Sequence, residues 1–388
     1  MKIVYLVNAR IPTEKAHGYQ IMKMCEEFLL QKVDIELWVP IRDNPIKDNA
    51  FDYYKIQNKF RIKYLPSFDF LRFVKSLGRW SYYLQVIAFC FKVLITKFPK
   101  DAIIYCRNAE LVFVLKLRGY KVAYECHDWF ATKTKINLFL LKKCDKIITT
   151  NNYIKQNFID NGFEESKLLT APNGVDLSII GIKDTRAEAL EKLSLDKKMK
   201  TRFLSSKVLL YTGSYKTMEI GKGIDEVLET LKILENKDLF FVAVGGSDKH
   251  REEYKKLAQQ LGVEKQVLFL GRYEQKQLAL FQRASEIFLM PFPDKAHYRH
   301  HMTPLKMFEY LAGGRPIIAS DLPSIREVLN EHNSVFCEPG NIDDLSLVIK
   351  NVLENHKLAD SISAQAVRDA QNFSWDMRAK NIIKFIKI

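Results

Sequence analysis

Short apolar runs alternate with amphipathic helical patterns along the whole chain, and this alternation limits the fold more than any other feature. Such runs, bounded by turn signals, are typical of buried strands, and helices between them are typical of parallel sheets. In the first half, the expected strands are 2–7, 34–39, 103–106, 122–126 and 146–150. In the second half, they are 208–212, 240–244, 267–270, 287–291, 317–320 and 334–337. The pattern predicts an α/β protein with doubly wound parallel sheets.

The alternation is interrupted near residue 180. After the turn Pro172-Asn173-Gly174, a polar stretch over 181–206 indicates a linker or the first outer helix of a new domain. A chain of 388 residues is long enough for two domains with their own cores. We therefore expect one domain over 1–180, a second over 181–370, and a last helical element over 371–388.

The composition, 47% hydrophobic and 27% charged, indicates an ordered protein. No apolar run reaches the roughly 18 residues of a membrane-spanning helix, and the opening MKIVYLVNAR becomes polar too quickly for a signal peptide. We therefore expect the chain in the cytoplasm. The six cysteines are scattered without a CxxC pair, which favours reduced core residues over a disulfide framework or a metal site.

A helix start near residue 303 is a candidate phosphate site. Thr303 offers a capping hydroxyl, and the ring of Pro304 suits the first helical turn. The helix is expected to stop at the double glycine 313–314, before a strand. Its start presents backbone N–H groups and a positive dipole end, which suit a diphosphate, and Lys306 and Glu309 lie nearby. The same pattern also describes an ordinary capped helix packed on a strand.

A second candidate segment is YTGSYKTMEIGKG, residues 211–223, placed between an expected strand and a helix over 224–234. A single lysine, Lys222, beside the helix start can offset much of the charge of a diphosphate, because lysine acts as a point charge. Lys216 is a second positive group in the loop. Gly213 and Gly223 would equally suit turns, with Lys222 simply solvated.

In the first half, His127 and Asp128 follow an expected strand at the end where ligands bind in such sheets. A lone histidine also suits a structural or solvent-facing position. By strand alternation, Glu125 is expected to point elsewhere, unless the strand ends earlier. The loop after the first strand runs from Asn8 to Gly18 and opens a helix.

Three histidines, His297, His300 and His301, have the spacing of zinc ligands on one helical face. They follow two prolines and precede a helix cap, so we expect a loop there. No carboxylate or cysteine accompanies them at ligand spacing. The sequence therefore predicts no metal site.

The segment around residue 303 resembles the nucleotide-sugar-binding signature of retaining GT-B glycosyltransferases, especially family 4. Members of that family carry a Glu, seven residues, and a second Glu. Here Glu309 matches the second Glu, and Pro304, Leu305 and Lys306 match the phosphate-binding helix start. His301 stands at the position of the first Glu.

The resemblance extends to the other segments. Lys222 matches the Lys-Gly pair that binds the donor diphosphate, whereas Ser214, next to Gly213, stands where the family usually has an Arg. His127 matches a histidine that hydrogen-bonds the donor sugar. Gly18 fits the glycine-rich loop that closes over donor and acceptor.

The resemblance implies two Rossmann-like domains facing each other across a cleft, with the last helix crossing back to the first domain. It implies a nucleoside-diphosphate-sugar donor, no cofactor and no catalytic metal, with Glu309 on the ribose hydroxyls. The implied catalytic residues are His127, Lys222 and Glu309. The implied donor-binding residues are Gly18, Gly213, Ser214, Lys222, His301, Thr303, Pro304, Leu305, Lys306 and Glu309.

The net charge of +14 is unevenly distributed. Residues 55–100 hold ten Lys or Arg against one acid, Asp69, interleaved with aromatic residues. This composition indicates an anionic membrane surface or a nucleic acid as a partner, and a solvated face is a third interpretation. The stretch carries no nucleic-acid motif, which favours the membrane and an acceptor on a lipid phosphate.

The sequence therefore predicts a retaining transferase that moves a sugar, from a UDP-sugar before a GDP-sugar, to a hydroxyl of a glycan or lipid-linked glycan. Polysaccharide or glycolipid assembly, in the cytoplasm and peripherally at the inner membrane face, would fit. Two alternatives stay open. The departures at His301 and Ser214 suit a nucleotide-sugar-binding subunit without activity, and a sugar-nucleotide epimerase on the same fold would need acidic residues that we cannot place.

Overall fold

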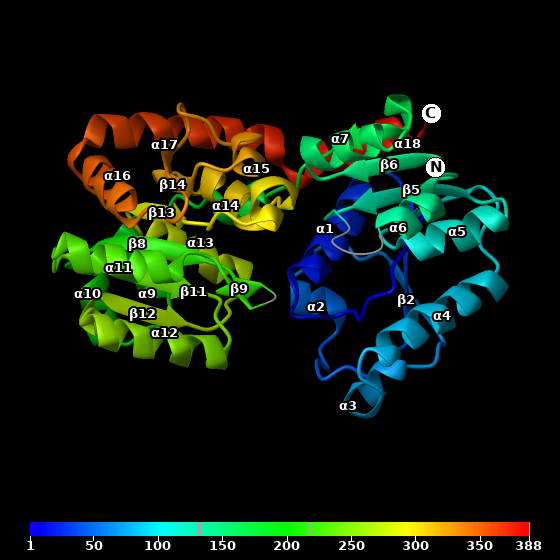
Figure 1. The fold of residues 1–388 in the computed structure, drawn as a ribbon, viewed down its shortest axis with the longest axis horizontal. Coiled ribbons are helices and arrows are strands. Elements are labelled where there is room, and N and C mark those ends of the chain that lie inside the picture. Colours follow the sequence, from blue (N-terminus) through cyan, green and yellow to red (C-terminus); the bar gives the residue numbers. More distant parts are fainter. Residues whose placement is uncertain (130–133, 218, 388) are drawn as a thin grey trace. The chain divides into compact units, whose positions relative to one another are not determined.

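The computed structural model describes residues 1–129, 134–217 and 219–387 and divides the chain into two compact units (Figure 1). Unit 1 comprises Met1–Pro172 and Trp375–Ile388, and unit 2 comprises Asn173–Ser374. The chain passes into unit 2 earlier than the boundary expected near 180, because the residues just before 180 form a short helix, Leu177–Ile180, that packs on other helices of unit 2.

Unit 1 is built on a seven-stranded parallel sheet in the order β3-β2-β1-β4-β5-β6-β7. Its strands are β1 (Lys2–Leu6), β2 (Asp34–Pro40), β3 (Arg61–Leu65), β4 (Ala102–Cys106), β5 (Lys121–Cys126), β6 (Lys146–Thr149) and β7 (Leu168–Thr170). The order reverses between β1 and β4, which pair in register from Lys2 opposite Ala102. In such sheets, ligands bind outside the carboxyl ends of the strands at this reversal.

The helices of unit 1 cover both faces of this sheet (Figure 1). They are α1 (Ala16–Leu30), α2 (Ala50–Tyr54), α3 (Val74–Leu77), α4 (Trp80–Ile95), α5 (Ala109–Leu117), α6 (Thr134–Leu141), α7 (Asn152–Asp160) and α18 (Trp375–Ile386), with 3₁₀ turns at Phe70–Phe73 and Glu165–Lys167. Because strand side chains alternate, Val4 and Leu6 join a core with α4, α5 and α6, whereas Tyr5 contacts Tyr105 on the other face. The last helix, α18, packs against α1.

Unit 2 has a six-stranded parallel sheet in the order β12-β11-β8-β13-β14-β15. Its strands are β8 (Lys207–Thr212), β11 (Leu239–Val244), β12 (Val267–Leu270), β13 (Ile287–Met290), β14 (Ile317–Ser320) and β15 (Val335–Cys337), beside a hairpin of β9 (Lys216–Thr217) and β10 (Ile220–Gly221). Here the order reverses between β8 and β13, so the loops after these two strands occupy the ligand position.

The helices of unit 2 also lie on both faces of its sheet. They are α8 (Leu177–Ile180), α9 (Arg186–Lys192), α10 (Lys197–Leu204), α11 (Ile224–Leu234), α12 (Asp248–Leu261), α13 (Gln275–Arg283), α14 (Leu305–Gly313), α15 (Pro323–Arg326), α16 (Ile342–Glu354) and α17 (His356–Ala370), with short 3₁₀ turns at Glu264–Gln266 and Gln371–Phe373. Val208 and Leu210 pack toward α13 and α14, and Leu209 and Tyr211 pack toward α11.

All eleven strands expected from the sequence are present, and the predicted fold class is confirmed. Two sheet strands and the hairpin were not expected. β3 is an edge strand whose RIKYL sequence is half-exposed and basic, so it lacks a buried apolar run. β7 has only three residues. Within the described residues, no helix is long and apolar enough to cross a bilayer.

Candidate functional site

The loop after β8 is held tightly against the end of β13. Gly223 has a φ of 85°, and a Cβ atom there would lie 1.6 Å from the carbonyl oxygen of Pro291, so only glycine fits. Gly213 has a φ of 112°. A Cβ atom at Gly213 would lie 3.8 Å from the Nζ atom of Lys306. The glycines bring this loop close to the first turn of α14.

Lys306 is a buried cation without a hydrogen-bond acceptor among the described residues. Its Nζ atom lies 3.3 Å from the ring centroid of Tyr211 and 5.0 Å from that of Phe292. Burial and the neighbouring charge of Lys222 lower the pKa of Lys306 well below its ordinary value. Aromatic faces compensate only part of the cost of burying an ammonium group. An anion bound here would supply the missing partner.

Lys222 adds a second positive charge beside Lys306. Its Nζ atom donates a 2.8 Å hydrogen bond to the hydroxyl of Ser214, and burial lowers its pKa to about 8. Ser214, the residue at the usual arginine position, thus orients the lysine. Lys216, by contrast, forms a 2.8 Å ion pair with Glu253 and is already neutralised.

The start of α14 differs from the sequence prediction. Its N-cap residue is Pro304, without a side-chain capping hydrogen bond, so the expected capping role of the Thr303 hydroxyl is wrong. The carbonyl of Thr303 instead accepts a 2.6 Å hydrogen bond from the side chain of Asn173. The helix begins at Leu305 and ends, as expected, at Gly314 in the left-handed conformation. The first amide groups of such a helix start suit an anion.

Glu309 is buried one turn further along α14. One carboxylate oxygen accepts a 3.1 Å hydrogen bond from the side chain of Gln275. Burial raises the pKa of Glu309, opposed by this bond and by the charge of Lys306. The bond to Gln275 fixes the carboxylate and leaves it acceptor sites for ligand hydroxyls.

The three clustered histidines lie in a one-turn π-helix, His297–His301, and not in a loop. π-Helical turns often occur at functional sites. The turn is anchored at Tyr298, whose carbonyl accepts a 2.6 Å hydrogen bond from Ser324. Over the described parts of the chain, no group of three or more His, Cys, Asp or Glu side chains is arranged to hold a metal ion.

In unit 1, His127 lies at the carboxyl end of β5, next to Glu125. Its Nε2 atom is 3.0 Å from a carboxylate oxygen of Glu125, and its Nδ1 atom is 3.4 Å from the side-chain nitrogen of Gln20. The expectation that Glu125 points elsewhere is therefore wrong, because residues two apart on a strand share a face. Burial and the charge of Arg107 lower the pKa of His127 to about 4, which makes the ring neutral near pH 7.

Glu125 is the centre of a buried ion-pair network. Tyr5 donates a 2.8 Å hydrogen bond to one carboxylate oxygen, and Arg378 from α18 forms an ion pair with the other. Arg107, after β4, approaches to 4.0 Å. Burial alone would raise the pKa of Glu125, but His127, Arg378 and Arg107 hold it well below its ordinary value. The network fixes one side of the His127 ring.

Gly18 lies in the first turn of α1 and packs against Tyr54. A Cβ atom there would lie 2.0 Å from the Tyr54 hydroxyl, which bonds the backbone of Thr13 on both its amide and its carbonyl. Gly18 thus shapes the loop after β1 through a contact within unit 1. Residues that the sequence did not single out are Arg107, Arg378 and Gln20. Arg107 directly follows an expected strand, which was the available signal.

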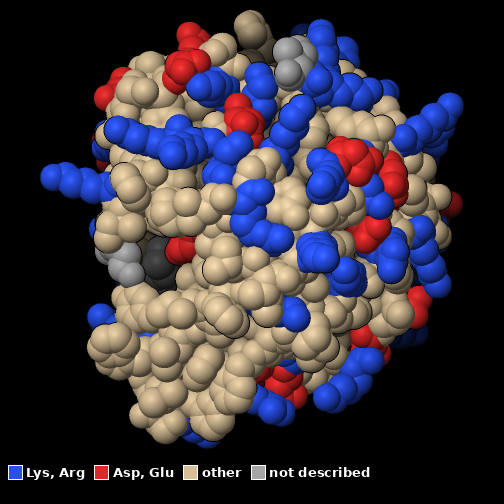
Figure 2. All heavy atoms as spheres, turned by 90° about the vertical axis from the view of Figure 1, so that its right-hand side faces the viewer, with Lys and Arg blue, Asp and Glu red and all other residues tan. Residues whose placement is uncertain are grey.

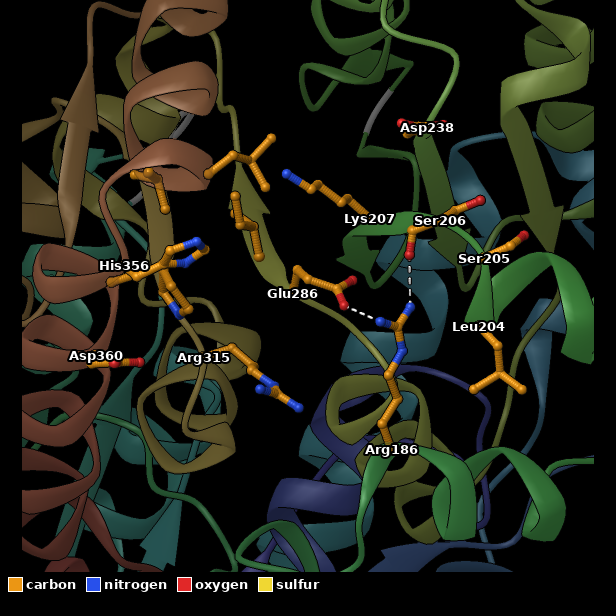
Figure 3. Close-up of a pocket in the computed structure, with 15 residues that line it drawn as sticks. Arg186, Leu204, Ser205, Ser206, Lys207, Asp238, Glu286, Arg315, His356 and Asp360 are labelled. Carbon is orange, nitrogen blue, oxygen red and sulfur yellow. Dashed lines mark hydrogen bonds and ion pairs between the residues drawn. The ribbon is translucent and has the colours of Figure 1, made fainter.

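A pocket of about 490 Å³ in unit 2 lies away from these residues (Figure 3). Lys207 and Ile287, at the amino ends of β8 and β13, line it, so it occupies the opposite edge of the sheet. Arg186 crosses it to form an ion pair with Glu286 and a 2.8 Å hydrogen bond to the carbonyl of Ser206 (Figure 3). Among its charged side chains, Arg186 and Glu286 are paired with each other.

Two family models match the chain. The model of glycosyl transferases group 1 matches residues 184–369, and the model of glycosyltransferase family 4 matches residues 18–179. An uncharacterized glycosyltransferase of Methanocaldococcus jannaschii is 26% identical over 185 residues, which cover 47% of this chain and 45% of that protein. The chain thus spans less than half the length of the curated relatives it matches.

Solved structures resemble the whole chain. HepE of Anabaena, solved in complex with UDP-glucose, has a TM-score of 0.74 at 16% identity, covering 100% of this chain and 99% of that one. Sucrose-phosphate synthase from Thermosynechococcus elongatus has a TM-score of 0.71 at 17% identity, covering 100% and 98%. At such identities the likeness shows a shared fold.

Proposed function

We propose that this chain transfers a sugar from a nucleoside diphosphate to an acceptor hydroxyl, with retention at the anomeric carbon. The chain belongs to the GT-B glycosyltransferases described by the group 1 and family 4 models. The observation that carries the proposal is the pair of cations near the start of α14, the buried Lys306 and the half-buried Lys222, which lie close enough for the charge of one to lower the pKa of the other. A UDP-sugar is our first choice of donor, supported by the UDP-glucose bound to a protein of the same fold.

The two lysines suit the leaving group. When the bond from the anomeric carbon to the diphosphate breaks, the electron pair stays on the diphosphate oxygen and negative charge develops there. Positive groups placed in advance around that oxygen stabilise the transition state more than the ground state. Lys306, Lys222 and the open start of α14 supply such groups, so the proposed chemistry needs no metal ion.

We assign the two ends of the donor to different residues. Glu309, held by Gln275, accepts hydrogen bonds from the ribose hydroxyls. His127 contacts the transferred sugar as a neutral ring, in line with its low pKa. The acceptor hydroxyl attacks from the face that the diphosphate leaves, which keeps the anomeric configuration. We place the acceptor among glycans or lipid-linked glycans, in polysaccharide or glycolipid assembly on the cytoplasmic side.

In one alternative, the chain binds the donor but does not catalyse transfer. Ser214 and His301 stand where the family usually has an arginine and a glutamate, so a nucleotide-sugar-binding subunit without transferase activity is the second candidate. The alternative shares Lys306, Lys222 and Glu309. Binding alone therefore does not separate the two functions.

The test is in two steps. Thermal unfolding is first measured with UDP-, GDP- and ADP-sugars, because a ligand at 100 times its Kd adds about 2.7 kcal/mol of stability. We expect a shift with one base that is lost in Lys306→Met. Sugar transfer to a panel of glycan and lipid-linked acceptors is then followed by NMR. Binding without transfer would favour the subunit, an inverted product would exclude retention, and no donor binding would refute both.

A further inference from the structure

Helix α4 in unit 1 exposes apolar side chains where a surface helix should be polar. Its buried positions include Ser81 and Gln85. Its outward positions carry Trp80, Ile87 and Phe91, which are 70%, 63% and 64% exposed. These positions recur at helical spacing, so they form one stripe along the helix. A soluble helix buries such a stripe, and exposure of this stripe indicates a binding partner.

The neighbouring helices continue this pattern. Phe113 on α5 and Phe139 on α6 are both exposed, with ring centroids 6.2 Å apart, and α4, α5 and α6 pack against one another in order. Most of the exposed large hydrophobic side chains of the described residues lie between positions 64 and 139. We call the exposed side chains of Trp80, Tyr83, Ile87, Phe91, Phe113 and Phe139 the apolar face.

Basic residues border the apolar face. From 70 to 100 the sequence contains no Asp or Glu, but it contains exposed Lys75 and Arg79 before α4 and exposed Lys97 and Lys100 after it. Figure 2 shows a broad area without charges in its lower left part, and Lys and Arg side chains gathered above it. Among the other basic residues of the 55–100 segment, Lys63 already has a partner: its Nζ atom lies 3.7 Å from the ring centroid of Trp38.

This combination fits the surface of an anionic bilayer. Trp and Tyr prefer the boundary between headgroups and acyl chains, Ile and Phe enter the acyl region, and Lys and Arg pair with anionic headgroups. With 16 residues, α4 is about 24 Å long, which suits a helix lying in the membrane plane. A symmetric contact with a second copy would bring two basic borders together. Aliphatic side chains such as Ile87 offer nucleic-acid bases no stacking surface.

We propose that the apolar face inserts at the boundary between headgroups and acyl chains of an anionic membrane, with Lys75, Arg79, Lys97 and Lys100 pairing with phosphate-bearing lipid headgroups. This inference stands on unit 1 alone and does not depend on the donor chemistry of unit 2. It places the enzyme where a hydroxyl on a lipid-linked acceptor would be found.

Co-sedimentation with lipid vesicles tests the proposal. The full chain is mixed with vesicles of phosphatidylcholine, or of phosphatidylcholine with about a third phosphatidylglycerol, at low and high salt. We expect binding to the anionic vesicles. High salt should weaken it, because the Debye length falls from about 10 Å at 0.1 M to about 3 Å at 1 M. Each basic residue contributes about fivefold to partitioning, so Lys75, Arg79, Lys97 and Lys100→Gln together should reduce it at least tenfold.

Matched variants distinguish insertion of the apolar face from nonspecific hydrophobic binding. Trp80, Ile87 and Phe91→Ser should reduce binding at least tenfold. Leu204, Ile233 and Leu347→Ser, which are 54%, 51% and 66% exposed in unit 2, should leave it unchanged. Circular dichroism checks that both variants are folded. Equal binding by the first variant and wild type would overturn insertion. Insertion would also be overturned if the wild type were a dimer and this variant a monomer, or if the wild type did not bind vesicles at low salt.

Discussion

Each unit buries a charged side chain near the carboxyl ends of its central strands, but only the one in unit 1 is paired with opposite charges. In unit 1, the carboxylate of Glu125 is surrounded by Tyr5, His127 and Arg378 from the same unit. In unit 2, Lys306 is also buried but has no hydrogen-bond acceptor among the described residues: aromatic faces and a second lysine lie beside it, and Glu309 acts on it only through its charge. A charge paired within the protein holds structure together, whereas a buried charge left unpaired is available to a ligand. The difference assigns positioning to the first network and ligand binding to the second.

The largest effect should come from breaking the paired network. In Arg378→Met, Glu125 would keep its charge in a fully buried site without its main cation, which typically costs about 3–5 kcal/mol. We expect a clear loss of stability in urea unfolding, with the tryptophan fluorescence of unit 1 as the probe.

Lys380→Met, on the same helix, is the control for this variant. Its 2.7 Å ion pair with Asp376 is exposed, and such pairs contribute about 0–1 kcal/mol. If Arg378→Met and Lys380→Met were equally stable, the Glu125 network would not be a structural centre, and the comparison between the two units would fail.

The opposite pattern is expected for the unpaired lysines. Lys222→Ala and Lys306→Met should each lower turnover by at least about 100-fold, the scale of losing one strong electrostatic contact in a catalytic site. Lys306→Met should not reduce stability, because the free protein gains nothing from a buried cation without an acceptor among the described residues. Lys222→Ala should cost no more than the one hydrogen bond to Ser214. Lys216→Ala, which removes an already paired lysine, should retain most activity. Near-normal turnover of Lys306→Met would remove this residue from the mechanism.

The sequence predicted the sheets well because their strands are buried on both faces and appear as continuous apolar runs. The family resemblance, and not the pattern alone, grouped Lys222 and Lys306 at one diphosphate, as matches to the Lys-Gly pair and to the helix start. The aromatic faces beneath Lys306 were not predictable, since Tyr211 in β8 and Phe292 after β13 are far apart in the sequence. Arg378 gave no local signal, because its partner Glu125 is 253 positions away.

His127 belongs to the paired network, yet its side chain remains 19% exposed, so the effect of its loss should be intermediate. We expect His127→Ala to reduce transfer about 10- to 100-fold, the range of a contact to the reacting sugar, while affinity for free UDP changes less than about threefold. Calorimetry with UDP and initial rates of transfer measure the two quantities. An equal loss of UDP affinity would show that the histidine contacts the nucleotide and not the sugar.

The smallest expected effect is the uptake of protons by the protein when UDP binds. Burial lowers the pKa of Lys222 to about 8, so at pH 8.5 much of the free protein carries this lysine neutral. A bound diphosphate stabilises the charged form and raises that pKa, so binding takes up protons, and affinity must fall as pH rises through this range. The terminal phosphate of UDP is already ionised at pH 8.5, so it does not contribute.

Calorimetry of UDP binding at pH 8.5, in buffers of different ionisation enthalpy, measures this uptake directly. We expect a fraction of a proton for wild type and for Lys216→Met, and less for Lys222→Met. The uptake that remains in Lys222→Met reports on Lys306, whose pKa burial also lowers. Wild type binding UDP without any uptake would mean that both lysines are already fully charged before the ligand arrives. The contrast between a satisfied unit 1 and an unsatisfied unit 2 would then lose its electrostatic basis, whatever the enzyme transfers.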